Sequence, residues 1–131
     1  MYKRQALPAS HNIMTWRAFI EGPADTLFEG ATFSLTMNFK DEYPKKPPHV
    51  RFETPVFHPN VYTNGEICLD LLQNNWSPLY DASNVLLAIQ TLLSDPNPDS
   101  PANSEAAKLF VNDKREYLRR VRQCVQESWL V

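Results

Sequence analysis

The sequence predicts a single α+β domain spanning residues 1–131, in which an antiparallel sheet is followed by helices. Three observations support this fold class. The chain has 131 residues, which is the length of one domain and too short for two. Apolar residues alternate with period two in the first half, and in the last third they recur at helical spacing. Short turns separate the strands, which favours an antiparallel meander.

Alternation is the clearest sign of the strands. In residues 14–21, every second position is apolar, so Met14, Trp16, Ala18 and Ile20 share one face. Residues 32–39 alternate apolar with polar side chains throughout. Val50 and Phe52 then mark a short strand. Residues 43–48 lie between strands, because their prolines cannot donate hydrogen bonds to a neighbouring strand. These patterns locate three strands, whereas residues 1–12 are polar, lack a period and predict no element.

Three helices are expected after the sheet, and the first two are separated by a proline-rich turn. Residues 83–94 carry apolar side chains at helical spacing, and Asp81 or Ser83 can cap the start of this helix. The three prolines of residues 95–101 end it and hold an extended turn. A short helix follows over residues 104–111, which a polar side chain just before it can cap.

A last helix begins after Asp113. Asp113 and Glu116 form a capping-box pattern, in which an acceptor is followed three residues later by Glu. One face of this helix carries Tyr117, Val121, Cys124, Val125 and Ser128. On such an apolar face, Cys124 is interpreted as a small buried side chain rather than a reactive one.

Residues 54–81 show no sustained period of either kind. Loops longer than about 12–15 residues are uncommon in compact domains and are usually functional or disordered. The apolar content of this segment, which includes Val56, Phe57 and Trp76, argues against disorder. The chain also has 11 Pro and only 3 Gly, which predicts a long stretch of fixed irregular backbone. We therefore expect an ordered, packed and functional segment, and it contains Cys68.

The overall composition excludes several classes of protein. The chain contains 13 Lys and Arg and 15 Asp and Glu, which gives a net charge of -2. A near-neutral charge argues against direct nucleic-acid binding. No run of 18 apolar residues exists, so no membrane span is expected, and the start lacks the apolar run of a signal peptide. Two cysteines in unlike contexts do not suggest a disulfide scaffold, which favours a reducing compartment, either cytoplasm or nucleus.

Cys68 is the candidate nucleophile, and its chemistry alone leaves alternatives open. His58 could pair with Cys68 in a protease-like hydrolase, although no third orienting residue is evident. Alternatively, the His58 imidazole binds nearby backbone and holds the loop. A zinc site is poorly supported, because there is no Cys-x-x-Cys and the histidines show no ligand spacing. No metal is therefore expected.

At these residues the chain closely resembles the family of ubiquitin-conjugating enzymes. Four motifs occur in the family's order around one cysteine: His58-Pro59-Asn60, Gly65-Glu66-Ile67-Cys68-Leu69-Asp70, Trp76-Ser77-Pro78 and Asp95-Pro96-Asn97-Pro98. The resemblance runs from about residue 12 to the end. It implies a four-stranded antiparallel meander sheet packed against helices, with a long ordered active-site loop. Residues 73–76 and 100–107 further resemble the subgroup that monoubiquitinates histones and acts in DNA-damage tolerance, and thus in DNA repair.

The resemblance also implies an activity, with partners. Cys68 would accept ubiquitin from the activating enzyme as a thioester, and ubiquitin would then pass to a substrate lysine with a RING-type ubiquitin ligase. Asn60 would stabilise the oxyanion or hold the loop that does so. No cofactor is expected, because the upstream activating enzyme uses the ATP. An inactive ubiquitin-binding or scaffold variant of the same fold is the alternative, and a ubiquitin-like modifier in place of ubiquitin is a further one.

Further roles follow from the same resemblance. Ser100 stands where many relatives carry Asp, and because Pro101 follows it, phosphorylation there would supply the missing negative charge. The implied surfaces are a lysine-approach gate of Tyr62, Asp81 and Ser100, loop support by His58 and Pro59, ligase binding by Lys45, Ser77, Pro78 and Leu79, and donor-ubiquitin binding by Leu87 and Thr91.

One departure from the family concerns the start of the chain. The family normally opens with an amphipathic helix that binds the activating enzyme and ligases. Residues 1–12 do not resemble this helix, and Pro8 would break it. The domain is therefore expected to be N-terminally truncated relative to the family, which leaves the chemistry at Cys68 in place but affects charging and ligase docking.

Overall fold

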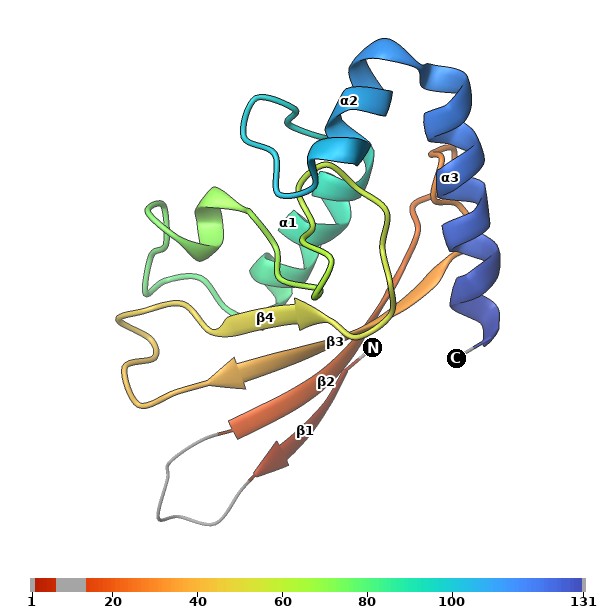
Figure 1. Ribbon diagram of the computed structural model, residues 1–131. Coiled ribbons are helices and arrows are strands. Elements are labelled where there is room, and N and C mark those ends of the chain that lie inside the picture. The colour runs from red at the N-terminus through yellow and green to blue at the C-terminus, as the bar shows by residue number, and fades with distance from the viewer. Residues whose placement is uncertain (1, 7–13, 131) are drawn as a thin grey trace.

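A computed structural model of the chain describes residues 2–6 and 14–130, with side chains from residue 14 onward. Figure 1 shows a sheet on one side of the molecule and helices on the other. The elements in chain order are β1 (Tyr2–Ala6), β2 (Met14–Glu21), β3 (Thr32–Phe39), β4 (His49–Phe52), the 3-10 turn η2 (Asp70–Leu72), α1 (Ala82–Ser94), α2 (Ser104–Asn112), α3 (Lys114–Glu127) and the 3-10 turn η3 (Ser128–Leu130).

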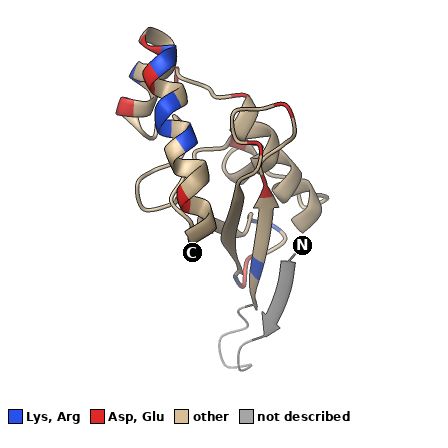
Figure 2. Cartoon of the chain, turned by 90° about the vertical axis from the view of Figure 1, so that its right-hand side faces the viewer, with Lys and Arg blue, Asp and Glu red and all other residues tan. Residues whose placement is uncertain are grey.

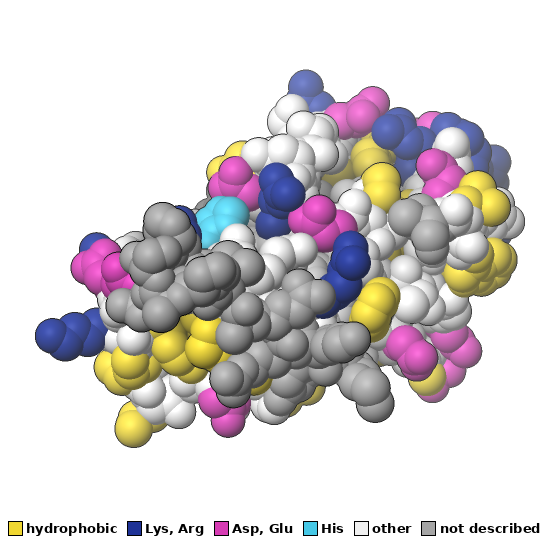
Figure 3. Space-filling model, turned by 90° about the horizontal axis from the view of Figure 1, so that it is seen from below, with side chains coloured by type: hydrophobic (Ala, Val, Ile, Leu, Met, Phe, Trp, Pro, Cys, Tyr) yellow, Lys and Arg dark blue, Asp and Glu magenta, His cyan; other side chains and the backbone are white. Residues whose placement is uncertain are grey.

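The sheet is antiparallel, with its strands in the order β1-β2-β3-β4. Register places Ala18 of β2 opposite Leu35 of β3, and Leu35 opposite Phe52 of β4. These three side chains face the core, so the predicted alternation and the α+β class with an antiparallel sheet are confirmed. Figure 3 views the other face of the sheet, where acidic and basic side chains are interspersed.

Strand β1 lies where the sequence predicts no element. It pairs with β2 along its whole length, from Tyr2 opposite Ala18 to Ala6 opposite Met14. An edge strand is held by backbone hydrogen bonds to one neighbour, and so it needs no alternating apolar pattern of its own. The expectation of a missing opening helix concerns residues 1–12. Of these, residues 1 and 7–12 lie outside the described part of the chain.

The core lies between the sheet and helices α1 and α3. It draws buried side chains from β2, β3, β4, α1, α3 and the irregular segment. Phe33 of β3 makes edge-on ring contacts with Phe28 and Phe52, at centroid distances of 6.0 and 5.8 Å. Contacts of this type add about 0.5–1.5 kcal/mol beyond the burial of apolar area. The predicted inward face of α3 is confirmed, because Tyr117, Val121, Cys124, Val125 and Ser128 are all buried.

Side-chain caps define where the three helices begin. Asp81 and Asn84 form a reciprocal capping box at α1, with both hydrogen bonds at 2.9 Å. The box predicted for α3 is only half formed. Asp113 accepts from the Glu116 N–H at 3.1 Å, but the Glu116 carboxylate turns to Arg119, at 2.7 Å. A charge-assisted pair one turn along the helix outcompetes the neutral backbone N–H.

The irregular segment of residues 54–81 is ordered and packed, as predicted. It folds back on itself through a bridge between Val61 and Ile67 and joins β4 through a bridge between Arg51 and Glu66. Gly65 makes this junction possible: its φ is 94°, and a Cβ there would lie 2.1 Å from the Phe52 carbonyl oxygen. Only glycine accommodates both the backbone conformation and the close approach.

Candidate functional site

Cys68 is held by its backbone at the surface of the irregular segment. Its N–H donates to the Asn60 carbonyl oxygen at 2.8 Å, directly after the bridge between Val61 and Ile67. The side chain is half-buried and is not in a disulfide. The thiol is therefore positioned by the main chain while its sulfur remains available, which a nucleophilic cysteine requires.

His58 is buried, and both of its ring nitrogens contact backbone groups. It is 0% exposed; Nε2 lies 2.7 Å from the Leu92 carbonyl oxygen, and Nδ1 accepts from the Asn60 N–H at 2.9 Å. These partners place the proton on Nε2. Burial lowers the pKa of His58 to about 4, against a smaller opposing effect of the hydrogen bond to Leu92. Both ring nitrogens are occupied by backbone groups, so neither is free to pair with Cys68 as the hydrolase alternative requires, and the contacts agree with a role in loop support.

Asn60 ties the cysteine loop to the segment of residues 95–101, here called the gate segment. Asn60 is 1% exposed, and its Nδ2 donates to the carbonyl oxygens of Asn97 and Ser100 at 2.8 and 3.1 Å. Its Oδ1 accepts from the Asn97 N–H at 2.8 Å. The side-chain amide is thus engaged on both ends, and it fixes the gate segment against the loop that carries Cys68.

The backbone of Pro59 extends this connection to the start of α2. Its carbonyl oxygen accepts from the N–H groups of Ala102 and Asn103, at 2.8 and 3.0 Å. The sequence analysis includes Asn97 in a family motif but predicts no partner for it. A signal was present: Asn97 lies between two prolines, so its N–H is one of few donors in that stretch. Its partner could not be read from the sequence, because the two residues are 37 positions apart.

The three predicted gate residues come from different elements. Tyr62 is 46% exposed beside the bridge before Cys68, exposed Asp81 caps α1, and exposed Ser100 lies in the gate segment. Among the described residues, no hydrogen bond or ion pair joins these three side chains to one another. The Asp81 carboxylate already accepts the Asn84 N–H at the start of α1, which limits its freedom to move.

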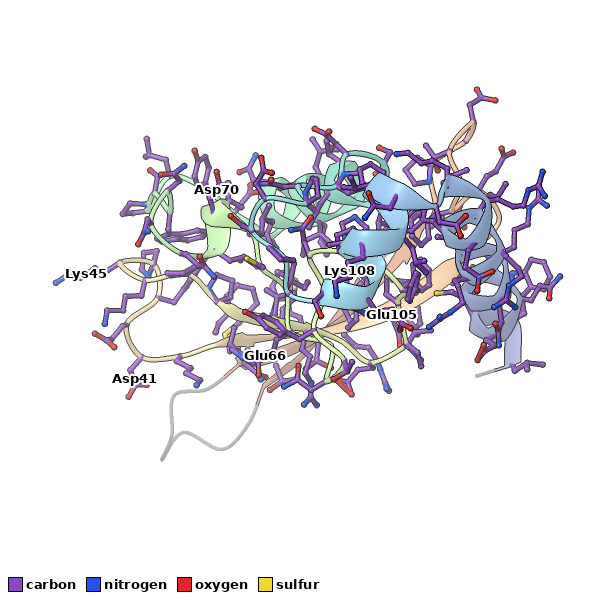
Figure 4. All side chains as sticks on the ribbon, turned by 45° about the horizontal axis from the view of Figure 1, so that its top comes forward. Asp41, Lys45, Glu66, Asp70, Glu105 and Lys108 are labelled. Atoms are coloured by element: carbon purple, nitrogen blue, oxygen red, sulfur yellow. The ribbon has the colours of Figure 1, made fainter. Side chains whose placement is uncertain are left out.

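Charge is distributed unevenly around Cys68. Residues 52–107 contain seven Asp and Glu and no Lys or Arg. Figure 4 shows Asp70 on η2, Glu66 beside the sheet and Glu105 on α2, all belonging to this stretch. Carboxylates around a site produce a negative potential that attracts cations. The stretch of sequence that contains Cys68 therefore has a net charge of -7, with His taken as neutral.

The loops with the predicted ligase-binding residues are joined by an aromatic contact that the sequence analysis did not foresee. Trp76 Nε1–H donates to the Pro44 carbonyl oxygen at 2.8 Å. Its ring also lies between Tyr43 and Tyr80, at centroid distances of 6.1 and 5.7 Å. Loop 43–48 and loop 76–80 are thus held as one unit. The predicted residues on them are Lys45, Ser77, Pro78 and Leu79, of which Leu79 is 91% exposed.

Helix α1 presents an apolar residue on its outer side. Leu87 is 62% exposed, and Thr91 one turn later is exposed as well. The Thr91 hydroxyl donates to the Leu87 carbonyl oxygen at 2.9 Å, which turns its polar atom toward the helix backbone. The outer face of α1 is therefore available for contact with a partner.

Cys124 differs from Cys68 in every respect that governs reactivity. It is buried on α3, where its Sγ accepts from the Phe57 N–H at 3.4 Å and donates to the Pro55 carbonyl oxygen at 3.3 Å. Burial raises the pKa of its thiol. The prediction of an inert core cysteine is confirmed.

Two further findings concern metals and membranes. Within residues 2–6 and 14–130, no group of three or more His, Cys, Asp or Glu side chains is arranged to hold a metal ion. Over the same residues, no helix is long and apolar enough to cross a membrane.

Comparison with known proteins gives a consistent result. The family model described as "Ubiquitin-conjugating enzyme" matches residues 2–125. The chain is 58% identical over 124 residues to "Ubiquitin-conjugating enzyme E2 2" of Trichoderma harzianum, covering 95% of this chain and 82% of that protein. It is 56% identical to the Saccharomyces cerevisiae protein of the same name, with 95% and 72% covered. Its identity to "Ubiquitin-conjugating enzyme E2 3" of Arabidopsis thaliana is 58%, with 94% and 82% covered.

Proposed function

Because the chain belongs to the ubiquitin-conjugating enzyme family, whose members are cysteine-thioester transferases, we propose that Cys68 is the residue that carries ubiquitin. One observation supports this assignment above the others. Of the two cysteines, Cys68 is only partly buried and is held through its backbone N–H, whereas Cys124 is buried and its sulfur has two backbone partners. Ubiquitin, the activating enzyme and ubiquitin ligases are the partners that membership of the family brings.

The reaction at Cys68 consists of two acyl transfers. The Cys68 thiolate attacks the thioester carbonyl carbon of ubiquitin on the activating enzyme; a new C–S bond forms and the activating enzyme's thiolate leaves. A lysine amine then attacks the same carbon, an isopeptide C–N bond forms, and the Cys68 thiolate leaves. The thioester already stores the required energy, so positioning and oxyanion stabilisation determine the rate.

Asn60 holds the gate segment in this mechanism. The two roles that the family suggests for this residue are oxyanion stabilisation and loop support. Its Nδ2 donates to Asn97 and Ser100 and its Oδ1 accepts from Asn97, so the amide has no donor left for an oxyanion while these bonds persist. We therefore assign Asn60 as a positioning residue. His58 and Pro59 hold the same loop through their hydrogen bonds to backbone groups.

The gate residues receive the acceptor lysine. Tyr62, Asp81 and Ser100 are exposed in a stretch that carries seven carboxylates and no cations. An acidic rim can orient the incoming ammonium group and ease its deprotonation. Phosphorylation of Ser100 would add charge of the same sign. If Ser100→Ala and Ser100→Asp transfer ubiquitin to free lysine at the same rate, charge at this position has no role.

A RING-type ligase is the proposed partner of the two loops that Trp76 joins. Exposed Leu79 and the flanking Pro78 offer an apolar contact, and Lys45 adds a charge on the other loop. Loops that are already held together lose little conformational entropy when they bind. Leu87 and Thr91 on α1 would contact the donor ubiquitin.

The subgroup and the compartment are proposed on narrower grounds. Residues 73–76 and 100–107 resemble the histone-monoubiquitinating subgroup that acts in DNA-damage tolerance, and several relatives carry the name "Ubiquitin-conjugating enzyme E2 2". We therefore propose histone lysines as substrates and a role in DNA repair, with action in the nucleus, the cytoplasm or both. Ubiquitination of histone-containing nucleosomes with a cognate ligase, compared with a globular acidic substrate, tests this.

One assay tests the central assignment. The chain is incubated with activating enzyme, ATP and ubiquitin, and the products are separated on a non-reducing gel. A thiol-sensitive adduct that disappears in Cys68→Ala and persists in Cys124→Ser is the expected result. An adduct that persists in Cys68→Ala would place the thioester elsewhere.

A further inference from the structure

Helix α3 carries a charge opposite to that of the rest of the chain. It has five Lys and Arg against two Glu, a net charge of +3, whereas the whole chain is at -2, so the remaining residues sum to -5. Figure 2 shows the basic residues gathered along α3. A local excess of this kind, on a chain that is acidic elsewhere, indicates a surface for a partner rather than a general adaptation for solubility.

Some of these cations are already engaged within the chain. Arg120 lies 3.2 Å from Glu105 and stacks over the Phe57 ring at 4.4 Å, and Lys114 stands over the Phe110 ring at 3.5 Å. Arg119 makes a two-pronged contact with Glu116, at 2.7 Å for both nitrogens. Arg115 and Arg122 remain, and neither has an ion-pair partner among the described residues.

The side chains of Arg115, Leu118, Arg119, Arg122 and Gln126 form one face of the helix, here called the α3 stripe. Their spacing of three or four residues places them about one turn apart, along the side opposite the buried Tyr117 and Val121. The stripe borders a shallow groove of about 620 Å³ that Glu116 and Gln123 also line. In Figure 1, α3 lies at the far side of the molecule from η2, the turn that follows Cys68.

We propose that the α3 stripe docks an acidic polypeptide segment that carries an apolar side chain among its carboxylates. Charge complementarity supplies the attraction: guanidinium groups bind carboxylates in a planar, two-pronged geometry, and Arg115 and Arg122 have their donors available. Half-buried Leu118 lies between them and offers an apolar contact. The glutamines of the groove can bind the backbone of an extended or helical peptide.

The same residues fit a nucleic acid poorly. Burial of an apolar residue such as Leu118 contributes nothing to a backbone of phosphates and sugars. Phosphate contacts would also call for a broad basic face, and α3 offers a single stripe on an otherwise acidic chain.

The experiment measures fluorescence anisotropy of a labelled twelve-residue peptide in which six glutamates surround one leucine, at 50 and 300 mM NaCl. The probe variant is the double substitution Arg115→Gln with Arg122→Gln, which removes two cations that form no ion pair with any residue that the structure describes. The matched control is Arg17→Gln with Lys40→Gln, two exposed cations on the sheet side. A twelve-base-pair DNA duplex and a peptide with glutamine in place of glutamate serve as competing ligands.

We expect saturable binding of the acidic peptide, weaker by roughly tenfold in the Arg115/Arg122 variant and changed less than about twofold in the control. Leu118→Ser should weaken binding by a few-fold at both salt concentrations, because the apolar contact is not screened. Thermal melting checks that each variant is folded.

Four outcomes would overturn the proposal: no binding at 50 mM NaCl, equal losses in the two double variants, tighter binding of the duplex than of the peptide, or a wild-type dimer that the Arg115/Arg122 variant abolishes. The last would assign the stripe to a second copy of the chain. Thioester formation, measured in parallel, reports on the activity at Cys68 separately from docking on α3.

Discussion

The two cysteines of this chain show how the same side chain acquires opposite properties. Cys124 sits on a regular helix with its sulfur between two backbone groups, at 3.4 and 3.3 Å, and burial raises the pKa of its thiol. Cys68 sits on irregular backbone, where its N–H rather than its sulfur is bound, at 2.8 Å. At Cys124 the hydrogen bonds hold the sulfur itself, whereas at Cys68 the hydrogen bond holds the backbone that carries the side chain.

The difference teaches that the reactive cysteine depends on its neighbours' backbone more than on nearby acids and bases. Both ring nitrogens of His58 contact backbone groups, so neither is free to deprotonate Cys68, and the Asn60 amide, which is no base, is also bound to backbone groups. An enzyme that receives an activated thioester needs a positioned nucleophile and a fixed approach path for the acceptor. The predictions below test this contrast, starting from the largest expected effect.

Removal of the Cys68 sulfur should abolish ubiquitin transfer altogether. Cys68→Ala should form no thiol-sensitive adduct in the charging assay, because no other described thiol is exposed. Cys68→Ser should give an adduct that resists thiols, since a hydroxyl forms an oxyester in place of the thioester. A wild-type level of thiol-sensitive adduct in Cys68→Ala would contradict the contrast between the two cysteines.

Asn60→Ala should slow transfer to lysine by roughly 100-fold. The substitution removes the three hydrogen bonds that tie the gate segment to the cysteine loop. Buried groups left unpaired in this way cost about 1–3 kcal/mol each, so thermal stability should also fall. Single-turnover discharge of pre-charged enzyme onto free lysine measures the rate. Discharge at the wild-type rate would show that the gate segment has no part in the transfer.

Protonation of His58 should destabilise the fold as pH falls. Burial lowers the pKa of His58 from its ordinary value of 6.5, which holds in the unfolded chain, to about 4 in the folded state, so the unfolded state binds the proton more readily. The stabilisation is complete above pH 6.5 and is lost on acidification toward pH 4. Between pH 7 and 5 the free energy of unfolding should decrease by about 2 kcal/mol from this group. Urea unfolding of the wild type and His58→Gln, which cannot titrate, isolates the effect; parallel curves would rule it out.

Trp76→Phe should reduce ligase-stimulated discharge by about tenfold while leaving charging of Cys68 nearly unchanged. The substitution keeps an aromatic ring between Tyr43 and Tyr80 but removes the hydrogen bond to the Pro44 carbonyl oxygen. Discharge measured with and without a RING-type ligase separates the two activities. An equal loss in both would place the defect at Cys68 rather than in the joined loops.

Cys124→Ser should have the smallest effect. A hydroxyl can replace both weak sulfur contacts, so we expect a loss of about 1 kcal/mol in stability from poorer packing and no change in charging. Thermal melting and the non-reducing gel measure the two quantities. A charging defect in a folded Cys124→Ser protein would mean that the Cys124 sulfur affects thioester formation at Cys68, which contradicts its assignment as a purely structural residue.

Much of this molecule could be predicted from its sequence, because local patterns specify local structure. Alternation identified strands β2, β3 and β4, helical spacing identified α1, α2 and α3, and the mixture of apolar residues with prolines identified an ordered segment around Cys68. His58 as a loop support also followed from the residues. Strand β1 could not be predicted in this way, because an edge strand pairs with its neighbour through backbone hydrogen bonds, and these require no particular side chains.

Hydrogen bonds between residues far apart in the chain could not be predicted from the sequence. The partnership of Asn60 with Asn97 spans 37 positions, and that of Trp76 with Pro44 spans 32. Each depends on how the whole chain packs rather than on a local period. Similarly, Glu116 could be assigned to a capping box, but its preference for Arg119 reflects competition between two possible partners.

The absence of lysine from residues 52–107 has a consequence for the charged enzyme. Once Cys68 carries an activated acyl group, any neighbouring primary amine on the same segment would compete with the substrate and consume the product on the enzyme itself. This stretch contains the cysteine loop, α1 and the gate segment, and it presents carboxylates, amides and hydroxyls but no amine. The elements of this stretch therefore offer no amine that could capture the acyl group, and the acceptor must come from outside it.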